Sequence, residues 1–384
     1  MFILYIIMIY LNLDNDWVMI MPYLTFQAAC RDDDEALRQL LRDNPMQGGI
    51  SVSFCREPSY FDACSVQGET ADVFVGKDTR TGALAGVGAR YGFPAFINGE
   101  IRSLAYLADL RVQAAYRNGV HLRRAYDFLR QQHQKQPYAI YTSMILKDNQ
   151  TALRTIASAR AGLPPYHAQG LVHTPMLLLA WQKPPIQADC TVRRATMQDW
   201  SQIVSFLNRE YARFQFAPYY READWFNHRF RGLNMDDIYL ACRDGVIIGT
   251  LALWQQSAFR QIRVADYQGV WRWLCPMYNA LAMFSSLTPL PEQGGILRCA
   301  YLALAAVEHD DLNVFRALLR HVYRVACGKG LHYLVGSLHE RHPLLPAFND
   351  YAKIDAGGYL FTVQFDNEML ALDGRVPFVE AAAL

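Results

Sequence analysis

The chain has 384 residues, more than the ~100 to 200 of a usual single domain, and this length predicts two domains. It carries 37 Lys and Arg against 36 Asp and Glu, so the formal net charge of +1 gives no support to a basic nucleic-acid-binding surface or an acidic disordered tail. Hydrophobic residues make up 52% of the chain and charged residues 19%, which is typical of a globular protein. We expect packed cores and no nucleic-acid partner.

The first 21 residues precede the more domain-like part of the chain. The stretch 1–11 is almost wholly apolar, but it is shorter than the ~20 residues that span a bilayer, and it lacks a basic region and a small-residue cleavage site. We therefore expect an apolar N-terminal extension over 1–21, no membrane anchor, and Met21 as the functional start.

The eight cysteines form no Cys-x-x-Cys pair and no cluster with histidine at metal-ligand spacing. This pattern favours free thiols in a reducing, cytoplasmic compartment and no metal site.

Three patterns recur in the same order in the two halves of the chain. A strand, an Asp-containing turn and an amphipathic helix at 25–41 match 191–207, and a hairpin at 72–88 matches 237–251. The third pair is the strand Ala-Tyr-Leu-Ala-Asp-Leu-Arg-Val at 105–112 and Ala-Tyr-Leu-Ala-Leu-Ala-Ala-Val at 300–307, each leading into a helix. The repeats predict two related domains at 22–180 and 190–384, with the Pro-Pro-containing stretch 181–189 as linker. The expected fold class is α/β (α+β), each domain a mixed, mostly antiparallel sheet flanked by helices.

Aromatic residues gather at 211–230 and again at Tyr267, Trp271, Trp273 and Tyr278. A ligand-stacking surface and a core or inter-domain interface both fit such clusters, and we favour the second.

The strand at 101–112 is followed by a loop with Arg117, Asn118 and Gly119 and then directly by a helix. A helix N-terminus offers unpaired N–H groups and positive potential, and a glycine lets the backbone approach an anion closely. Strand, basic loop and helix together predict a phosphate cradle, to which Arg117 would add charge-assisted contacts.

This order of elements resembles the GNAT superfamily of acyl-CoA-dependent N-acyltransferases. The resemblance covers the strand–turn–helix at 25–41, the hairpin and the strand–loop–helix, and it extends to the strand 138–145 with Asn149 and Ala152 at the next helix start. The stretches 44–48 and 56–61 are similar to a tandem, two-domain bacterial subgroup.

The resemblance implies acetyl-CoA or another acyl-CoA as co-substrate and no metal. The strand would hold the pantetheine arm and the loop the pyrophosphate, so the implied binding residues are Leu110, Arg111, Val112, Arg117, Asn118, Gly119, Val120, His121, Leu122, Asn149 and Ala152. The loop departs from the family pattern Gln/Arg-x-x-Gly-x-Gly/Ala, because either Tyr116 and His121 or Val120 and Leu122 take the places of basic and small residues. In the second domain 308–313 is acidic and has no glycine, so we expect acyl-CoA to bind the first domain alone.

The function that the resemblance implies is transfer of an acetyl or other acyl group from CoA to a small-molecule or peptide amine. The candidate bases are Glu100 and Asp109, and the candidate acids are Tyr106 and Tyr166. Strand alternation places Tyr106 and Asp109 on opposite faces. The alternative is a catalytically silent module that binds CoA or a protein; a homodimer is also left open.

Overall fold

The computed structural model describes residues 23–46, 49–117, 119–156, 163–282, 284, 287–366 and 370–384. The predicted N-terminal extension, Met21 and Asn118 lie outside this part. The helices and strands, in chain order, are β1 (Leu24–Ala28), α1 (Asp34–Arg42), β2 (Ile50–Cys55), α2 (Cys64–Gln67), β3 (Thr70–Asp78), β4 (Leu84–Ile97), β5 (Glu100–Val112), α3 (Gly119–Lys135), β6 (Ile140–Leu146), α4 (Gln150–Ile156), β7 (Tyr166–His173), β8 (Met176–Leu178), β9 (Thr191–Arg194), α5 (Trp200–Tyr211), β10 (Ile238–Arg243), β11 (Val246–Trp254), β12 (Gln261–Tyr267), α6 (Trp271–Ala282), β13 (Cys299–Val307), α7 (Leu312–Cys327), β14 (Tyr333–Val335), β15 (Leu338–His339), β16 (Lys353–Ile354) and β17 (Gly357–Val363).

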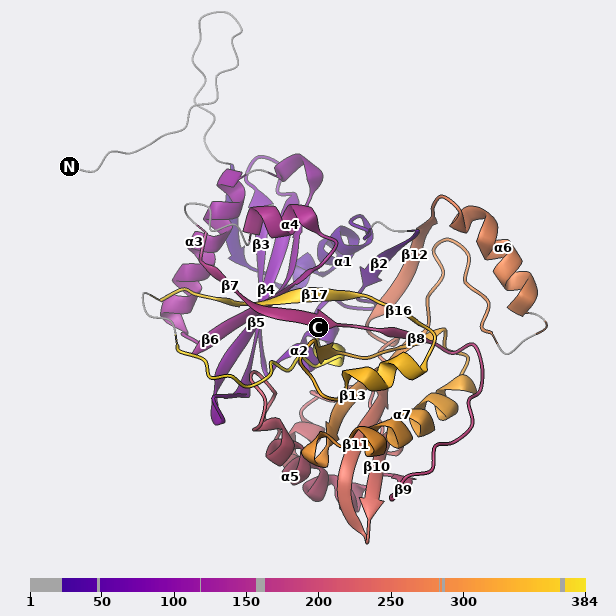
Figure 1. The fold of residues 1–384 in the computed structure, drawn as a ribbon. Coiled ribbons are helices and arrows are strands. Elements are labelled where there is room, and N and C mark those ends of the chain that lie inside the picture. Colours follow the sequence, from indigo (N-terminus) through magenta and orange to yellow (C-terminus); the bar gives the residue numbers. More distant parts are fainter. Residues whose placement is uncertain are drawn as a thin grey trace, which may run out of the picture.

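Two large sheets organise the molecule (Figure 1). The first has the strand order β1-β3-β4-β5-β6-β17-β7-β15, and the second has the order β16-β8-β14-β13-β11-β10-β9. Most neighbours are antiparallel, whereas β5 with β6 and β13 with β14 are parallel. These mixed, mostly antiparallel sheets with flanking helices confirm the predicted fold class.

The alternation of the strands gives each sheet apolar faces, and the helices cover these faces with their own apolar stripes. In the second sheet, Leu240 of β10 packs in one core with α5, and its neighbour Tyr239 packs in another core with α7. The two helices therefore lie on opposite faces of the sheet. On the first sheet, α1 covers Val75 and Tyr91, and α3 packs with Leu107 through Leu129.

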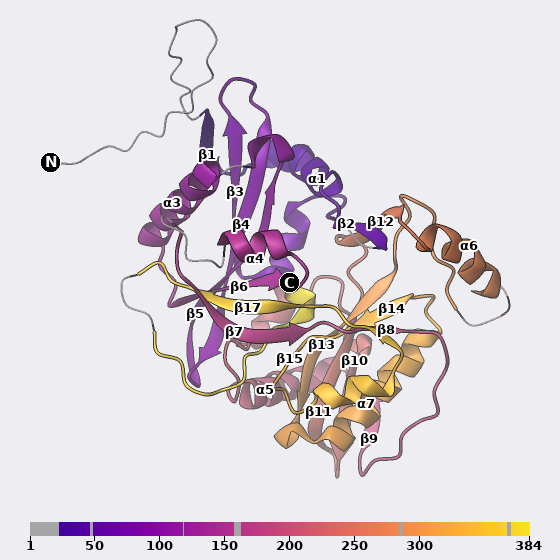
Figure 2. The same cartoon turned by 45° about the horizontal axis from the view of Figure 1, so that its top comes forward.

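Each large sheet contains a strand from the other half of the sequence. β17 lies between β6 and β7 and pairs with both, through Tyr359↔Ile145 and Tyr359↔Leu171. β8 pairs with β14 and β16 in the second sheet. Figure 2 shows the yellow β17 among the magenta strands of the first sheet. The two halves are thus joined by exchanged strands as well as by the stretch 181–189.

The same irregularity interrupts the matching strands of the two sheets. Asp109 in β5 has φ of 59° and lies beside a register shift in the pairing with β4. Leu304 in β13 has φ of 52° and lies beside a register shift in the pairing with β11. These two residues occupy the same position in the sequence repeat at 105–112 and 300–307. A residue with positive φ adds one residue to its strand relative to the partner strand and bends the strand. Both sheets therefore carry a β-bulge, one at Asp109 and the other at Leu304.

The two aromatic groups have different surroundings. Phe214, Tyr220 and Phe230 are buried in the core beneath the second sheet. In contrast, α6 extends from the body of the protein beside β12 (Figures 1 and 2), and Trp273 is 81% exposed. The expectation of a core or interface role is therefore wrong for Trp273, because α6 packs chiefly on β12. Within the described ranges, every helix is too short or too polar to cross a bilayer.

A fragment of residues 22–185 should be poorly soluble when expressed alone. Without the second half, β6 and β7 lose β17, which pairs with both, and two sheet edges are exposed. The soluble fraction and gel-filtration profile of this fragment provide the measurement, and co-expression with residues 186–384 serves as the control. A monomeric, well-folded isolated fragment would contradict the importance of the exchanged strand.

Candidate functional site

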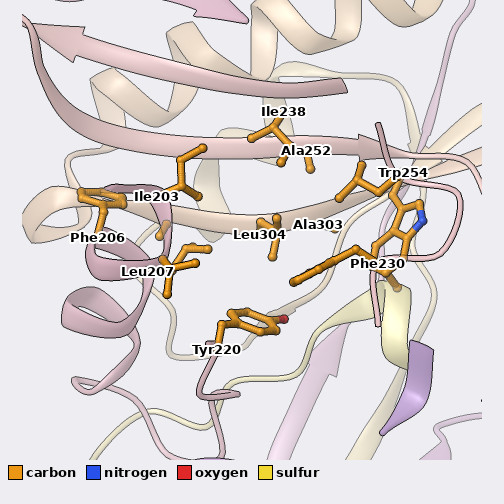
Figure 3. Packing of buried hydrophobic residues seen from close by; sticks show 14 of the residues in the cluster. Ile203, Phe206, Leu207, Tyr220, Phe230, Ile238, Ala252, Trp254, Ala303 and Leu304 are labelled. Carbon is orange, nitrogen blue, oxygen red and sulfur yellow. The ribbon is translucent and has the colours of Figure 1, made fainter. Parts of the chain in front are cut away.

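A cavity of about 660 Å³, including the part open to solvent, lies between the two sheets. The first half contributes Val66, Gln67, Phe93, Leu104, Tyr106 and Thr142 to its wall, and the second half contributes Pro218, Tyr220, Arg229, Phe230, Trp254 and Glu380. Figure 3 shows the rings of Tyr220, Phe230 and Trp254 in the core beside Leu304. Concave, mostly apolar sites with a few polar groups are typical binding sites.

The cavity begins where two parallel strands of the first sheet separate. The pairing of β5 with β6 runs from Leu104↔Ile140 to Leu107↔Ser143, whereas β5 continues to Val112 and β6 to Leu146. Tyr106 and Thr142, which are paired near this point, line the cavity. An extended ligand can therefore approach the unpaired backbone of β5 and present its end to the cavity.

The bulge in β5 brings Asp109 to the same face as Tyr106, which corrects the expected alternation. Tyr91 of β4 lies directly opposite Tyr106, and its hydroxyl donates to Asp109 Oδ2 at 2.8 Å. The expectation failed because the positive φ at Asp109 shifts the strand by one position.

Asp109 is the counter-ion of a buried arginine. Its Oδ2 accepts hydrogen bonds from the Arg56 guanidinium at 2.7 Å and from the Tyr60 hydroxyl at 2.9 Å, in addition to the Tyr91 hydroxyl. Burial opposes ionisation, but Arg56 and the hydroxyl donors hold the pKa of Asp109 below its usual value. An ionised carboxylate held in this way is a weak proton acceptor. Arg56 also donates to Gln67 Oε1 at 2.6 Å, and so this network fixes a side chain that lines the cavity.

Glu380 is the carboxylate that the structure places in the cavity. Its oxygens accept from the backbone N–H groups of Leu304, at 3.0 Å, and Ala382, at 3.4 Å. Burial raises the pKa of Glu380 to about 7, and these backbone donors offset only part of that effect. Glu380 therefore exchanges its proton near neutral pH, as a general base requires.

Sequence reasoning did not identify Glu380. It is the sole charged residue in the stretch 376–384, Val-Pro-Phe-Val-Glu-Ala-Ala-Ala-Leu, and a lone carboxylate among apolar residues is the signal that could have found it.

The other predicted catalytic residues have separate locations. Tyr106 lines the cavity. Tyr166 instead shares a hydrogen bond of 2.7 Å with the Tyr126 hydroxyl of α3. Glu100 begins β5, at the end remote from the strand separation, where its exposed carboxylate pairs with Arg102. The structure thus brings Tyr106 and Glu380 to one site and leaves Tyr166 and Glu100 outside it.

The predicted phosphate-binding loop leads into α3, which begins at Gly119. Arg117 is bound within the protein, because its guanidinium donates to the Val112 carbonyl at 3.0 Å and to Asn44 Oδ1 at 2.9 Å. His121 is buried against the ring of Tyr23, while Val120 is 48% exposed. Of the predicted groups that the structure describes here, the backbone N–H groups at the helix start are the remaining candidates for binding an anion.

The remaining predicted binding residues lie on either side of the strand separation. Leu110, Arg111 and Val112 form the part of β5 beyond its pairing with β6. Leu122 lies in the first turn of α3. Asn149 caps α4, since its Oδ1 accepts from the Ala152 N–H at 3.0 Å. Among the described residues, no three His, Cys, Asp or Glu side chains gather as a metal site.

The Asp109→Asn variant should be less stable than the wild type by about 3–5 kcal/mol, because it leaves the buried charge of Arg56 without its counter-ion. Urea unfolding measures this difference. Asp236→Asn, at an exposed position, is the matched control and should change stability by less than about 0.5 kcal/mol. An Asp109→Asn protein with wild-type stability and much reduced acyl transfer would instead make Asp109 the base.

No protein-family model and no curated protein sequence matches the chain. Solved structures do match it. The Saccharomyces cerevisiae N-myristoyltransferase with bound myristoyl-CoA superposes with a TM-score of 0.60 at 10% identity, over 92% of this chain and 85% of that chain. The GCN5-related glucosamine N-acetyltransferase region of a fungal multi-domain GH3 β-N-acetylglucosaminidase gives 0.61 at 13% identity, over 92% of this chain and 40% of that one. The chain therefore has the fold of GNAT-like acyltransferases.

Proposed function

We propose that the protein transfers an acyl group from an acyl-CoA to an amine in the cavity between the two sheets. The observation that carries the proposal is the coincidence of two features at one place. β5 separates from β6 after the pair Leu107↔Ser143, one residue beyond Tyr106, which lines the cavity. The same cavity contains Glu380, whose pKa is raised to about 7.

The first half would hold the acyl-CoA. The residues that fit it are the unpaired end of β5, Leu110 to Val112, for the pantetheine arm and the N–H groups at the start of α3 for the pyrophosphate. The solved relatives with bound myristoyl-CoA support an acyl-CoA of some kind as co-substrate. The identity of the acyl group, acetyl or longer, is a finer part of the proposal.

The second half is proposed to be a degenerate copy without an acyl-CoA site. At the start of α7, the position that corresponds to the start of α3, the Asp311 carboxylate accepts from the N–H groups of Asn313 and Val314. The protein's own carboxylate thus occupies this helix start and would repel a phosphate.

The chemistry requires a neutral amine. Glu380 would take a proton from the amine as its nitrogen attacks the thioester carbonyl, forming the amide bond and releasing the CoA thiolate. Burial raises the pKa of Tyr106, which keeps its hydroxyl protonated and able to donate a hydrogen bond to the developing negative charge. The CoA thiolate that is released then takes up a proton from solvent or from Glu380, which completes the reaction.

The alternative is a silent module that binds CoA or a protein without turnover. The observation in its favour is the start of α3, where Arg117 is already bound to Val112 and Asn44 and larger side chains replace the small residues of the family pattern.

Binding of CoA should depend on the first half alone. Gly119→Glu places a carboxylate at the proposed phosphate site and should abolish binding, whereas Asn313→Glu at the start of α7 should leave it unchanged. Isothermal titration calorimetry with CoA measures both variants. Equal losses in the two would contradict a single site.

Glu380→Gln should lower kcat for acyl transfer by about 100-fold or more, in line with the usual contribution of a positioned base. Wild-type activity should rise with pH through about 7 as Glu380 ionises, and the variant should lose this dependence. Thiol release from acetyl-CoA and myristoyl-CoA, with a panel of amines, provides the measurement. Glu100→Gln, at the exposed end of β5, is the control that should retain activity.

Unfolding measurements separate this effect from instability. The folded-state pKa of Glu380 lies above its ordinary value of 4.5, so the folded protein binds more protons between pH 4.5 and 7 and loses stability from this group as pH rises through that window. Glu380→Gln removes this loss and should be at least as stable as the wild type at pH 8. Unchanged turnover in the variant would eliminate Glu380 as the base.

A further inference from the structure

Arg229 places a positive charge in the cavity wall that the protein compensates only in part. Its residue exposure is 7%. The guanidinium donates to Glu69 Oε1 over a long 3.4 Å, and Arg221 donates to the same carboxylate at 3.2 and 3.3 Å. One carboxylate thus serves two guanidinium groups, and one positive charge remains in excess.

The direction of the Arg229 side chain is fixed by two aromatic rings. Its guanidinium carbon lies 5.5 Å from the centre of the Phe93 ring and 5.2 Å from that of Tyr220. A guanidinium has five N–H donors, of which the contacts with Glu69 and the Tyr220 hydroxyl occupy only a part. The remaining donors are available to a ligand in the cavity that Arg229 lines.

Glu380 supplies the opposite charge. Burial raises its pKa and backbone N–H groups offset part of that effect, while no arginine or lysine of the described residues is among the causes. Both charges act on the phenol of Tyr220, whose pKa burial raises, Glu380 raises further and Arg229 lowers. The cavity therefore carries a separated pair of opposite charges near Tyr220, neither fully neutralised by the protein.

Apart from Gln67, Thr142 and the tyrosine hydroxyls, the rest of the wall is apolar and largely aromatic, with Phe216, Phe230, Trp254, Leu360 and Phe378 among its residues. Such a wall suits a flat apolar group and offers little to the hydroxyls of a sugar. An amine without a carboxylate would leave the excess positive charge beside Arg229 uncompensated and partly desolvated, which is costly, and a polyamine would be repelled by it.

We propose, on the basis of the acyl transfer proposed above, that the acceptor is a free aromatic α-amino acid, with its amine at Glu380, its carboxylate at Arg229 and its ring on the aromatic wall. The acyl group would form an amide with the α-nitrogen, and the carboxylate would stay ionised throughout. Arg229 would thus determine specificity, while Glu380 receives the proton.

Matched acceptors test this proposal on the full-length protein. With acetyl-CoA and myristoyl-CoA as donors, kcat/KM for L-phenylalanine should exceed that for 2-phenylethylamine and for L-phenylalanine amide by about 10- to 100-fold, as expected for charge-assisted hydrogen bonds to a desolvated carboxylate. L-Alanine should be a poorer acceptor than L-phenylalanine because it lacks the ring. Equal or better use of the amine, the amide or L-alanine would overturn the inference and leave acyl transfer standing.

Variants at two arginine positions test which residue recognises the carboxylate of the acceptor. Arg229→Gln should bring the ratio between L-phenylalanine and 2-phenylethylamine close to one. Arg221→Gln, which removes the other partner of Glu69 from outside the cavity wall, should keep the wild-type ratio. Thermal unfolding confirms that both variants fold, and Arg229→Lys, which keeps the charge without the bidentate geometry, should fall between them. A ratio unchanged by Arg229→Gln would overturn the role of this residue.

Calorimetry with L-phenylalanine separates the acceptor from the reaction. Binding of L-phenylalanine that Arg229→Gln weakens at least 10-fold, with no transfer from either acyl-CoA, would support the amino-acid site and contradict the proposed enzymatic function. Transfer to other amines, together with no binding of L-phenylalanine, would support the proposed enzymatic function and contradict the amino-acid site.

Discussion

The insertion of β17 between β6 and β7 is the constraint from which the site follows. Because a strand from the end of the chain completes the first sheet, the segment after it must return across the join between the two sheets. On the way it pairs with the second half, through the hydrogen bonds Gln215 N–H to Val376 O and Phe378 N–H to Gln215 O. Glu380 follows two residues later and enters the cavity from this fixed backbone. The strand exchange thus positions the candidate base.

The two β-bulges, in β5 and in β13, stabilise different buried charges. In β5 the bulge rotates Asp109 onto the face of Tyr91, where it neutralises Arg56 and, through that guanidinium, holds Gln67 in the cavity wall. In β13 the equivalent residue is Leu304, whose backbone N–H is directed to Glu380 instead. One bulge therefore uses a side chain to stabilise a buried cation, and the other uses a main-chain donor to hold a carboxylate that still titrates near neutral pH.

Local patterns in the sequence predicted the local features of this molecule. The repeat at 105–112 and 300–307 marks two strands that share a bulge, and the Gly119 loop marks the start of α3. The side-chain face of Asp109 was predicted wrongly, because strand alternation assumes two residues per repeat and the sequence does not show where a bulge inserts an extra one. β17 was missed as a strand of the first sheet, since its pairing with β6 joins residues more than 200 positions apart. Glu380 lies outside every motif, so only the fold connects it with Tyr106.

The asymmetry between the two helix starts fits the proposal that only the first half binds acyl-CoA. The proposed phosphate site lies at the start of α3, which begins at Gly119, whereas the start of α7 is capped by Asp311. A half that binds no anion could carry acidic groups near its own sheet, and Glu380 accepts a hydrogen bond from Leu304 of β13. Had both helix starts been open, the carboxylate and a second pyrophosphate would have shared one sheet at an electrostatic cost. In the proposed function, the first half would hold the anionic donor and the second would supply the base and the Arg229 charge, with the acceptor enclosed between.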